Sequence, residues 1–394
     1  MAVIFVLHGM GKHDKGWWGG ENGTLKELKS IRRFDANRGS EATIESLVKD
    51  KKEGGDIEWI ELNYDDLAER LRNSIKEGDG FDDLIDDANE RADALLTVDT
   101  ANQWKADWSA AVNDINPFEN HEFTAEAAWD VYLCSMKPTR HYLALHVAQQ
   151  IIDFLKTPGN ISKHWSMLAH SLGTALAQDV LNILFELWMS GKQELKRWRQ
   201  AECVCFLANF TRTKVGDILV TRNPTSAETF VWPSQRGKNS ICKYYMSARH
   251  KLDPLSYLAD EMPSRWVEPP DDFSVNKYRI FEHSDLNYLP SSLADDVIEF
   301  GGYIHSVENY FANPLIHLAF LARALRTKKI YENSGGSFNS RQKYRDSAEK
   351  LFLETRKPSV ANISQLVIDN RINNAKDWST AVGSLWDLYI GDRV

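Results

Sequence analysis

A short segment, Ala169-His170-Ser171-Leu172-Gly173, constrains the fold more than any other part of the chain. An apolar run at residues 165–168 precedes it, and a helix-forming stretch at residues 174–188 follows it. The pattern predicts a buried strand, a sharp turn with a serine at its tip, and then a helix. Ala169 and Gly173 are small enough to let the strand and the helix pass close together there.

Apolar runs elsewhere in the chain alternate with helical patterns. An alternation of this kind predicts the α/β class, with a mostly parallel central sheet and helices on both faces. The expected strands lie at residues 3–7, 57–62, 165–169, 204–207, 241–246 and 278–281, and the clearest helices at 141–155, 174–188 and 314–325.

The domain organisation follows from the segments that interrupt this alternation. We expect one domain over residues 1–330, with a helical cap inserted at about 65–130 in which Trp104, Trp108 and Trp129 are packing anchors. Residues 12–38 are expected to be a glycine-rich and charged connection. Residues 331–394 are expected to form a polar helical extension that packs on the same domain.

Charge and composition exclude several classes of function. Residues 61–100 hold 13 acidic and 4 basic side chains, and this difference equals the net charge of −9. No basic stripe is present, so the chain is not expected to bind nucleic acid. No apolar stretch is long enough to span a bilayer, and residues 1–7 are too short for a signal peptide, so we expect a cytoplasmic protein without an integral membrane segment.

The cysteines are expected to be reduced thiols in the core. Cys203 and Cys205 alternate on an apolar run, which places them on one face of a buried strand. Their spacing lacks the second ligand pair of a zinc site, so no metal is expected there. The other two cysteines are Cys134 and Cys242.

Ser171 needs a base and an acid before its hydroxyl can act as a nucleophile. Asp253 is the candidate acid because it follows the expected strand at 241–246 and is fixed by Pro254. Asp217 is the alternative acid, and Asp271 and Asp272 are weaker alternatives.

The candidate base is His305, which two glycines precede and a helix follows. His283 is the alternative base, because it closely follows the expected strand at 278–281. His317 lies within an apolar helix and is expected to be buried and hydrogen-bonded, and His170 is expected to pack near the turn.

An oxyanion hole requires two backbone N–H groups directed at one point. Leu172, at the start of the helix after the turn, is the first candidate donor. Met10 is the second, because His8-Gly9-Met10-Gly11 forms a loop directly after the first expected strand.

These motifs together resemble the α/β-hydrolase superfamily of serine esterases and lipases. The resemblance covers roughly residues 1–325 and follows the family order of nucleophile, acid and histidine. The segment from Ile304 to Pro314 is similar to the histidine segment of poorly characterised bacterial and fungal hydrolases, which favours His305 as the base. The resemblance implies a triad of Ser171, Asp253 and His305, acyl-enzyme chemistry, and neither a cofactor nor a metal.

The expected function is therefore hydrolysis of carboxylic esters, with small-molecule or lipid esters as substrates. One alternative is a binding or scaffolding protein that keeps the fold without turnover. The other is an acyltransferase or an amidase that uses the same triad.

Overall fold

The computed structural model describes residues 2–9, 13, 15–20, 23–25, 32–35, 40–43, 57–77, 80–114, 129–130, 133–134, 137–160, 163–190, 200–210, 240–250, 253, 278–283, 305–311 and 314–326. A six-stranded sheet organises them, and every neighbouring pair of its strands is parallel. In spatial order the strands are β4 (Ile57–Leu62), β1 (Ala2–Leu7), β5 (His164–His170), β6 (Val204–Leu207), β7 (Tyr245–His250) and β8 (Tyr278–His283). The predicted α/β class with a parallel sheet is confirmed.

The central strands are buried on both faces, which is why they form continuous apolar runs. In β1 the side chains of Val3, Phe5 and Leu7 enter one apolar core. Those of Ala2, Ile4 and Val6 enter a second core on the opposite face. The sheet therefore separates two cores, and each core requires its own cover of helices.

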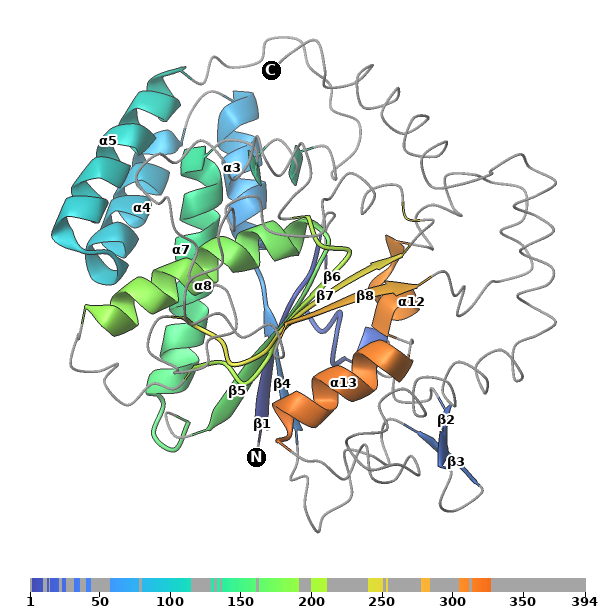
Figure 1. The fold of residues 1–394 in the computed structure, drawn as a ribbon. Coiled ribbons are helices and arrows are strands. Elements are labelled where there is room, and N and C mark those ends of the chain that lie inside the picture. The colour runs from blue at the N-terminus through green and yellow to red at the C-terminus, as the bar shows by residue number, and fades with distance from the viewer. Residues whose placement is uncertain are drawn as a thin grey trace, which may run out of the picture.

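The helices lie on both faces of the sheet (Figure 1). On one face, α7 (Lys137–Lys156) and α8 (Leu172–Met189) cover the first core. On the other face, α13 (Pro314–Ala324), preceded by the short α12 (Val307–Phe311), covers the second core. The sequence placed α7 and α8 correctly to within a few residues at each end.

The acidic region contains three helices, α3 (Asp65–Glu77), α4 (Phe81–Leu95) and α5 (Val98–Asp114). Buried residues of all three belong to the same core as β1 and α7. Trp104, Trp108 and Trp129 are almost fully buried in that core. They are packing residues, as predicted.

The strand predicted at residues 241–246 is wrong in its bounds, because β7 begins at Tyr245 and continues to His250. Ile241 and Cys242 are buried, but Cys242 makes only an isolated bridge to Ala201. An apolar run indicates which residues are buried, but it does not indicate which of them pair with a neighbouring strand. The apolar run therefore begins before the first paired residue of β7.

The connection predicted at residues 12–38 contains a strand that the sequence did not indicate. β2 (Arg32–Asp35) pairs antiparallel with β3 (Ser40–Thr43) in a separate two-stranded sheet. Both strands are short and mostly polar, so they lack the apolar alternation that marks a strand. The extension predicted at 331–394 lies outside the described residues.

The four cysteines are buried thiols that form no disulfide within the described residues, as predicted. Cys203 and Cys205 share one core, so both face the same side of the sheet.

Candidate active site

Ser171 lies at a sharp turn between the end of β5 and the start of α8. Its backbone has a positive φ, with φ 53° and ψ −132°, a conformation that non-glycine residues rarely adopt. The Ser171 N–H donates to the carbonyl of Leu207 at 2.9 Å. The turn is thus tied to the end of the neighbouring strand β6.

Two glycines allow the backbone to pass close to this turn. A Cβ atom on Gly173 would lie 1.9 Å from the carbonyl oxygen of His8. A Cβ atom on Gly9 would lie 2.7 Å from the Cβ atom of Ser171. The segment after β1 therefore lies directly against the Ser171 turn. A side chain at position 173 would displace backbone, and one at position 9 would displace Ser171.

The structure brings Ser171, His305 and Asp253 together at one point. His305 Nε2 lies 2.6 Å from Ser171 Oγ, and His305 Nδ1 lies 2.8 Å from Asp253 Oδ2. The carboxylate accepts the proton on Nδ1, which leaves the lone pair on Nε2 to accept the Ser171 hydroxyl proton. This arrangement of hydroxyl, imidazole and carboxylate can activate an oxygen nucleophile.

The burial of Asp253 favours the orientation in which the His305 ring turns its Nδ1–H towards the carboxylate. Asp253 is fully buried, whereas the His305 side chain is 14% exposed. A buried carboxylate requires hydrogen-bond donors, and its Oδ2 atom accepts from His305 Nδ1 and from the Tyr310 hydroxyl.

The alternative acids Asp217, Asp271 and Asp272 lie outside the described residues. The alternative base His283 is the last residue of β8, where it pairs with His250. Of the two histidines weighed as the base, His305 is therefore the one with a described contact to Ser171.

Tyr310 is part of this site, and sequence reasoning missed it. Its hydroxyl donates to Asp253 Oδ2 at 2.6 Å and accepts the N–H of His250 at 2.9 Å. The segment that contains it was singled out for His305 and for Asn-Pro, but nothing in the sequence indicated which partner the hydroxyl would have.

His170 packs beside the candidate base, as predicted. Its Nε2 atom donates to the backbone carbonyl of His305 at 2.5 Å, and the two rings lie 4.9 Å apart. Burial, with the nearby His305 ring as a lesser cause, lowers the pKa of His170 to about 3. The ring is therefore neutral near pH 7 and positions the backbone of His305. His317 is likewise buried, and it bonds to the carbonyl of Phe311 at 2.9 Å, as predicted.

Of the two candidate oxyanion donors, Leu172 lies within the described residues. Leu172 is the first residue of α8 and is fully buried, at the positive end of the helix dipole. Met10 lies outside the described residues, but its neighbour Gly9 is held firmly. The Gly9 carbonyl accepts the Tyr64 hydroxyl at 2.6 Å and His8 Nδ1 at 2.9 Å.

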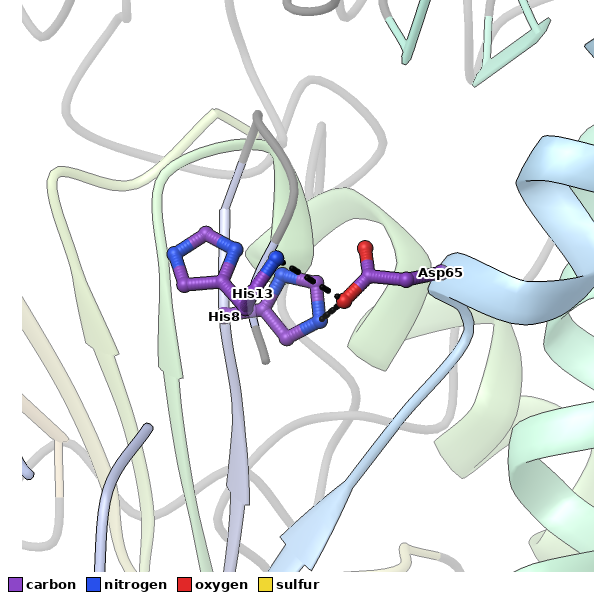
Figure 2. Close-up of side chains that lie close together, drawn as sticks. All are labelled: His8, His13 and Asp65. Atoms are coloured by element: carbon purple, nitrogen blue, oxygen red, sulfur yellow. Dashed lines mark hydrogen bonds and ion pairs between the residues drawn. The ribbon is translucent and has the colours of Figure 1, made fainter. Parts of the chain in front are cut away.

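A second group of polar side chains lies beside this loop. Figure 2 shows His8, His13 and Asp65 side by side. Each offers one potential metal-ligand atom, and these three atoms all lie within 4.8 Å of one another. Sequence reasoning did not single out His13 or Asp65, and it considered only the backbone around His8. Among the described residues, these three form the one group that has the composition of a metal site.

Comparisons with known protein families, with curated proteins and with solved structures give no significant match. The resemblance to α/β-hydrolases therefore depends on the motifs and on the side-chain geometry. In the described part of the chain, no helix is both long enough and apolar enough to cross a bilayer.

Proposed function

We propose that this protein is a serine hydrolase that cleaves carboxylic esters on an α/β-hydrolase fold. One observation carries the proposal. The His305 ring lies between Ser171 Oγ and the buried Asp253 carboxylate, with hydrogen-bond distances of 2.6 and 2.8 Å on its two sides. Three residues from distant parts of the chain meet in the order that nucleophilic catalysis requires.

The fold assignment is supported by the position of the nucleophile. Ser171 follows β5, a strand with neighbours on both sides, and its backbone has a positive φ at the start of a helix, where the serine is buried beside His305. This strand, strained serine and helix are the features of a nucleophile elbow.

In the proposed acylation step, Ser171 Oγ attacks the ester carbonyl carbon while His305 Nε2 takes the hydroxyl proton. The tetrahedral intermediate then collapses, the bond to the leaving oxygen breaks, and His305 returns the proton to the departing alcohol. Asp253 holds the ring orientation and stabilises the imidazolium. The backbone N–H groups of Leu172 and Met10 stabilise the negative charge on the carbonyl oxygen.

In the deacylation step, a water molecule attacks the acyl group on Ser171. His305 takes a proton from this water, the acyl–oxygen bond to Ser171 breaks, and the proton passes to the serine. The carboxylic acid is released and the enzyme is restored.

A fluorophosphonate probe tests the nucleophile, because it phosphonylates only an activated serine. We expect labelling of the wild type and complete loss of labelling in Ser171→Ala with an unchanged circular dichroism spectrum. Hydrolysis of p-nitrophenyl esters of graded chain length should give the acyl preference. A folded wild-type protein that neither reacts with the probe nor hydrolyses any ester would instead indicate a binding protein.

A pair of histidine variants tests the base. His305→Gln should lower kcat by roughly 10⁴-fold or more, as expected when one member of a catalytic triad is removed. His283→Gln should keep kcat within a few-fold of the wild type. The reverse result would assign the base to His283.

A further inference from the structure

We propose that His8, His13 and Asp65 bind a divalent transition-metal ion, with zinc the best match to their chemistry. The inference goes beyond the proposed hydrolase activity and does not depend on it. It uses residues that the ester-cleaving reaction does not require.

The topology brings the three residues to one edge of the sheet. His8 directly follows β1, and Asp65 is the first residue of α3, three positions after the end of β4. Since β1 and β4 are parallel neighbours, their carboxyl ends meet at the same edge (Figure 2). His13 follows a few residues after His8, and its N–H donates to Asp65 Oδ2 at 3.1 Å.

The hydrogen bonds of His8 leave one ring nitrogen available as a ligand. Nδ1 lies 2.9 Å from the Gly9 carbonyl, which can only accept, so Nδ1 carries a proton. This contact is the usual second-shell bond of a metal-binding histidine, and it leaves a lone pair on the opposite nitrogen.

That opposite nitrogen is buried and lacks a hydrogen bond. His8 is 1% exposed, and Nε2 has no hydrogen-bond partner in the described part of the chain. It lies 3.2 Å from Asp65 Oδ2. A lone pair facing a carboxylate oxygen at this distance is repulsive, so a cation is needed between the two atoms.

The distances suit a metal ion as that cation. Two ligands bound to one tetrahedral zinc at about 2.0–2.2 Å lie roughly 3.3 Å apart, close to the 3.2 Å between His8 and Asp65. A ring nitrogen of His13 completes a set within 4.8 Å, and metal binding requires this half-buried side chain to rotate towards the other two ligands. Two imidazoles and one carboxylate form a borderline set of nitrogen and oxygen ligands that zinc accepts readily.

Metal uptake tests the proposal directly. The full-length protein is dialysed against a chelator and then titrated with zinc, with bound metal measured by elemental analysis. We expect one tightly bound zinc per chain, and a loss of affinity in His13→Gln and Asp65→Asn that exceeds the roughly 10- to 100-fold cost of changing a second-shell partner. Zinc should also raise the melting temperature of the wild type, because it binds the folded state.

Trp17 provides a local readout of binding at this group. Its ring lies 5.6 Å from that of His8 and 5.3 Å from that of His13. Paramagnetic cobalt at the site should therefore quench part of the tryptophan fluorescence, and Trp17→Phe should reduce the quenched part. Circular dichroism of each variant separates loss of the ligand from loss of the fold.

His164→Gln is the matched control, because His164 also contacts a carboxylate, that of Glu202 at 3.1 Å, but lies at the opposite end of the sheet. This variant should bind zinc like the wild type. If the wild type, His13→Gln and Asp65→Asn take up zinc equally, or if none of them takes it up, the proposal is overturned. Absence of uptake would make a proton the cation between His8 and Asp65.

Discussion

At the scale of single residues, the candidate acid depends on a tyrosine outside the proposed triad. Tyr310 lies behind Asp253, and its hydroxyl connects the carboxylate to the backbone N–H of His250. The same oxygen atom of Asp253, Oδ2, therefore accepts hydrogen bonds from the Tyr310 hydroxyl and from the His305 ring. Tyr310 is a positioning residue, since it acts through Asp253.

Tyr310→Phe should lower kcat more than it changes KM, because the carboxylate loses the donor that fixes its orientation. It should also destabilise the protein by about 1–3 kcal/mol, since the buried N–H of His250 loses its acceptor. If the pH–rate profile keeps its shape and kcat stays within about 10% of the wild-type value, the role of Tyr310 is purely structural. Urea unfolding gives the stability change independently.

Some of the site could be predicted from the sequence because it follows local rules. Ser171 and Asp253 each follow an expected strand, so topology predicts that they lie at the same edge of the sheet. His305 is preferred over His283 because its segment resembles the histidine segment of known hydrolases. Tyr310 could not be assigned, because its partner Asp253 lies 57 positions away in the chain. Likewise Tyr64 bonds to a carbonyl 55 positions away, a contact that no local pattern reports.

At the scale of elements, the site is built by the close crossing of α8 and the chain that leaves β1. Gly173 lies in the first turn of α8 with its α-carbon against the His8 carbonyl. Thr174 adds a further tie, since its hydroxyl accepts the N–H of Phe210 after β6. The start of α8 is thus fixed to two neighbouring strands.

Gly173→Ala should destabilise the protein by more than the roughly 1–3 kcal/mol typical of overpacking. The reason is that its Cβ atom would meet backbone at 1.9 Å and not the end of a flexible side chain. Gly19→Ala is the control, because its nearest neighbour is the Glu61 side chain at 3.5 Å, an ordinary contact. Thermal unfolding of the two variants measures the difference, and equal melting temperatures would contradict the proposed crossing.

The elements themselves could be predicted where apolar patterns were strong. The strands β1, β4 and β6 were placed from their continuous apolar or alternating runs. The bounds of β7 were not, because burial extends to residues that precede its ladder. β2 and β3 were missed, since pairing between two short polar strands leaves no periodic signal.

At the scale of the whole molecule, histidines packed within the fold should make its stability depend on pH. Burial lowers the pKa of His146, on α7, to about 4, and that of His170 to about 3, from an ordinary value of 6.5. In the unfolded chain both groups take up protons near pH 6.5. The unfolded state therefore binds more protons than the folded state between pH 6.5 and these lower values.

The free energy of unfolding should accordingly fall as the pH drops from about 6.5 towards 3. His146→Gln should flatten this dependence, because it removes a neutral buried group that the unfolded chain would protonate. The expected change in slope corresponds to about 2–3 kcal/mol summed over the window. Urea unfolding at a series of pH values measures it, and parallel curves for variant and wild type would show that His146 does not contribute.

The positive φ of Ser171 lowers the stability of the fold at the position of the proposed nucleophile. A side chain at φ 53° costs about 1–3 kcal/mol that glycine would not incur. Ser171→Gly and Ser171→Ala both remove the proposed nucleophile, yet only glycine releases the strain, so Ser171→Gly should melt at the higher temperature. The protein then keeps a locally destabilising backbone at the residue on which the proposed reaction depends, a trade-off that selection for activity would maintain.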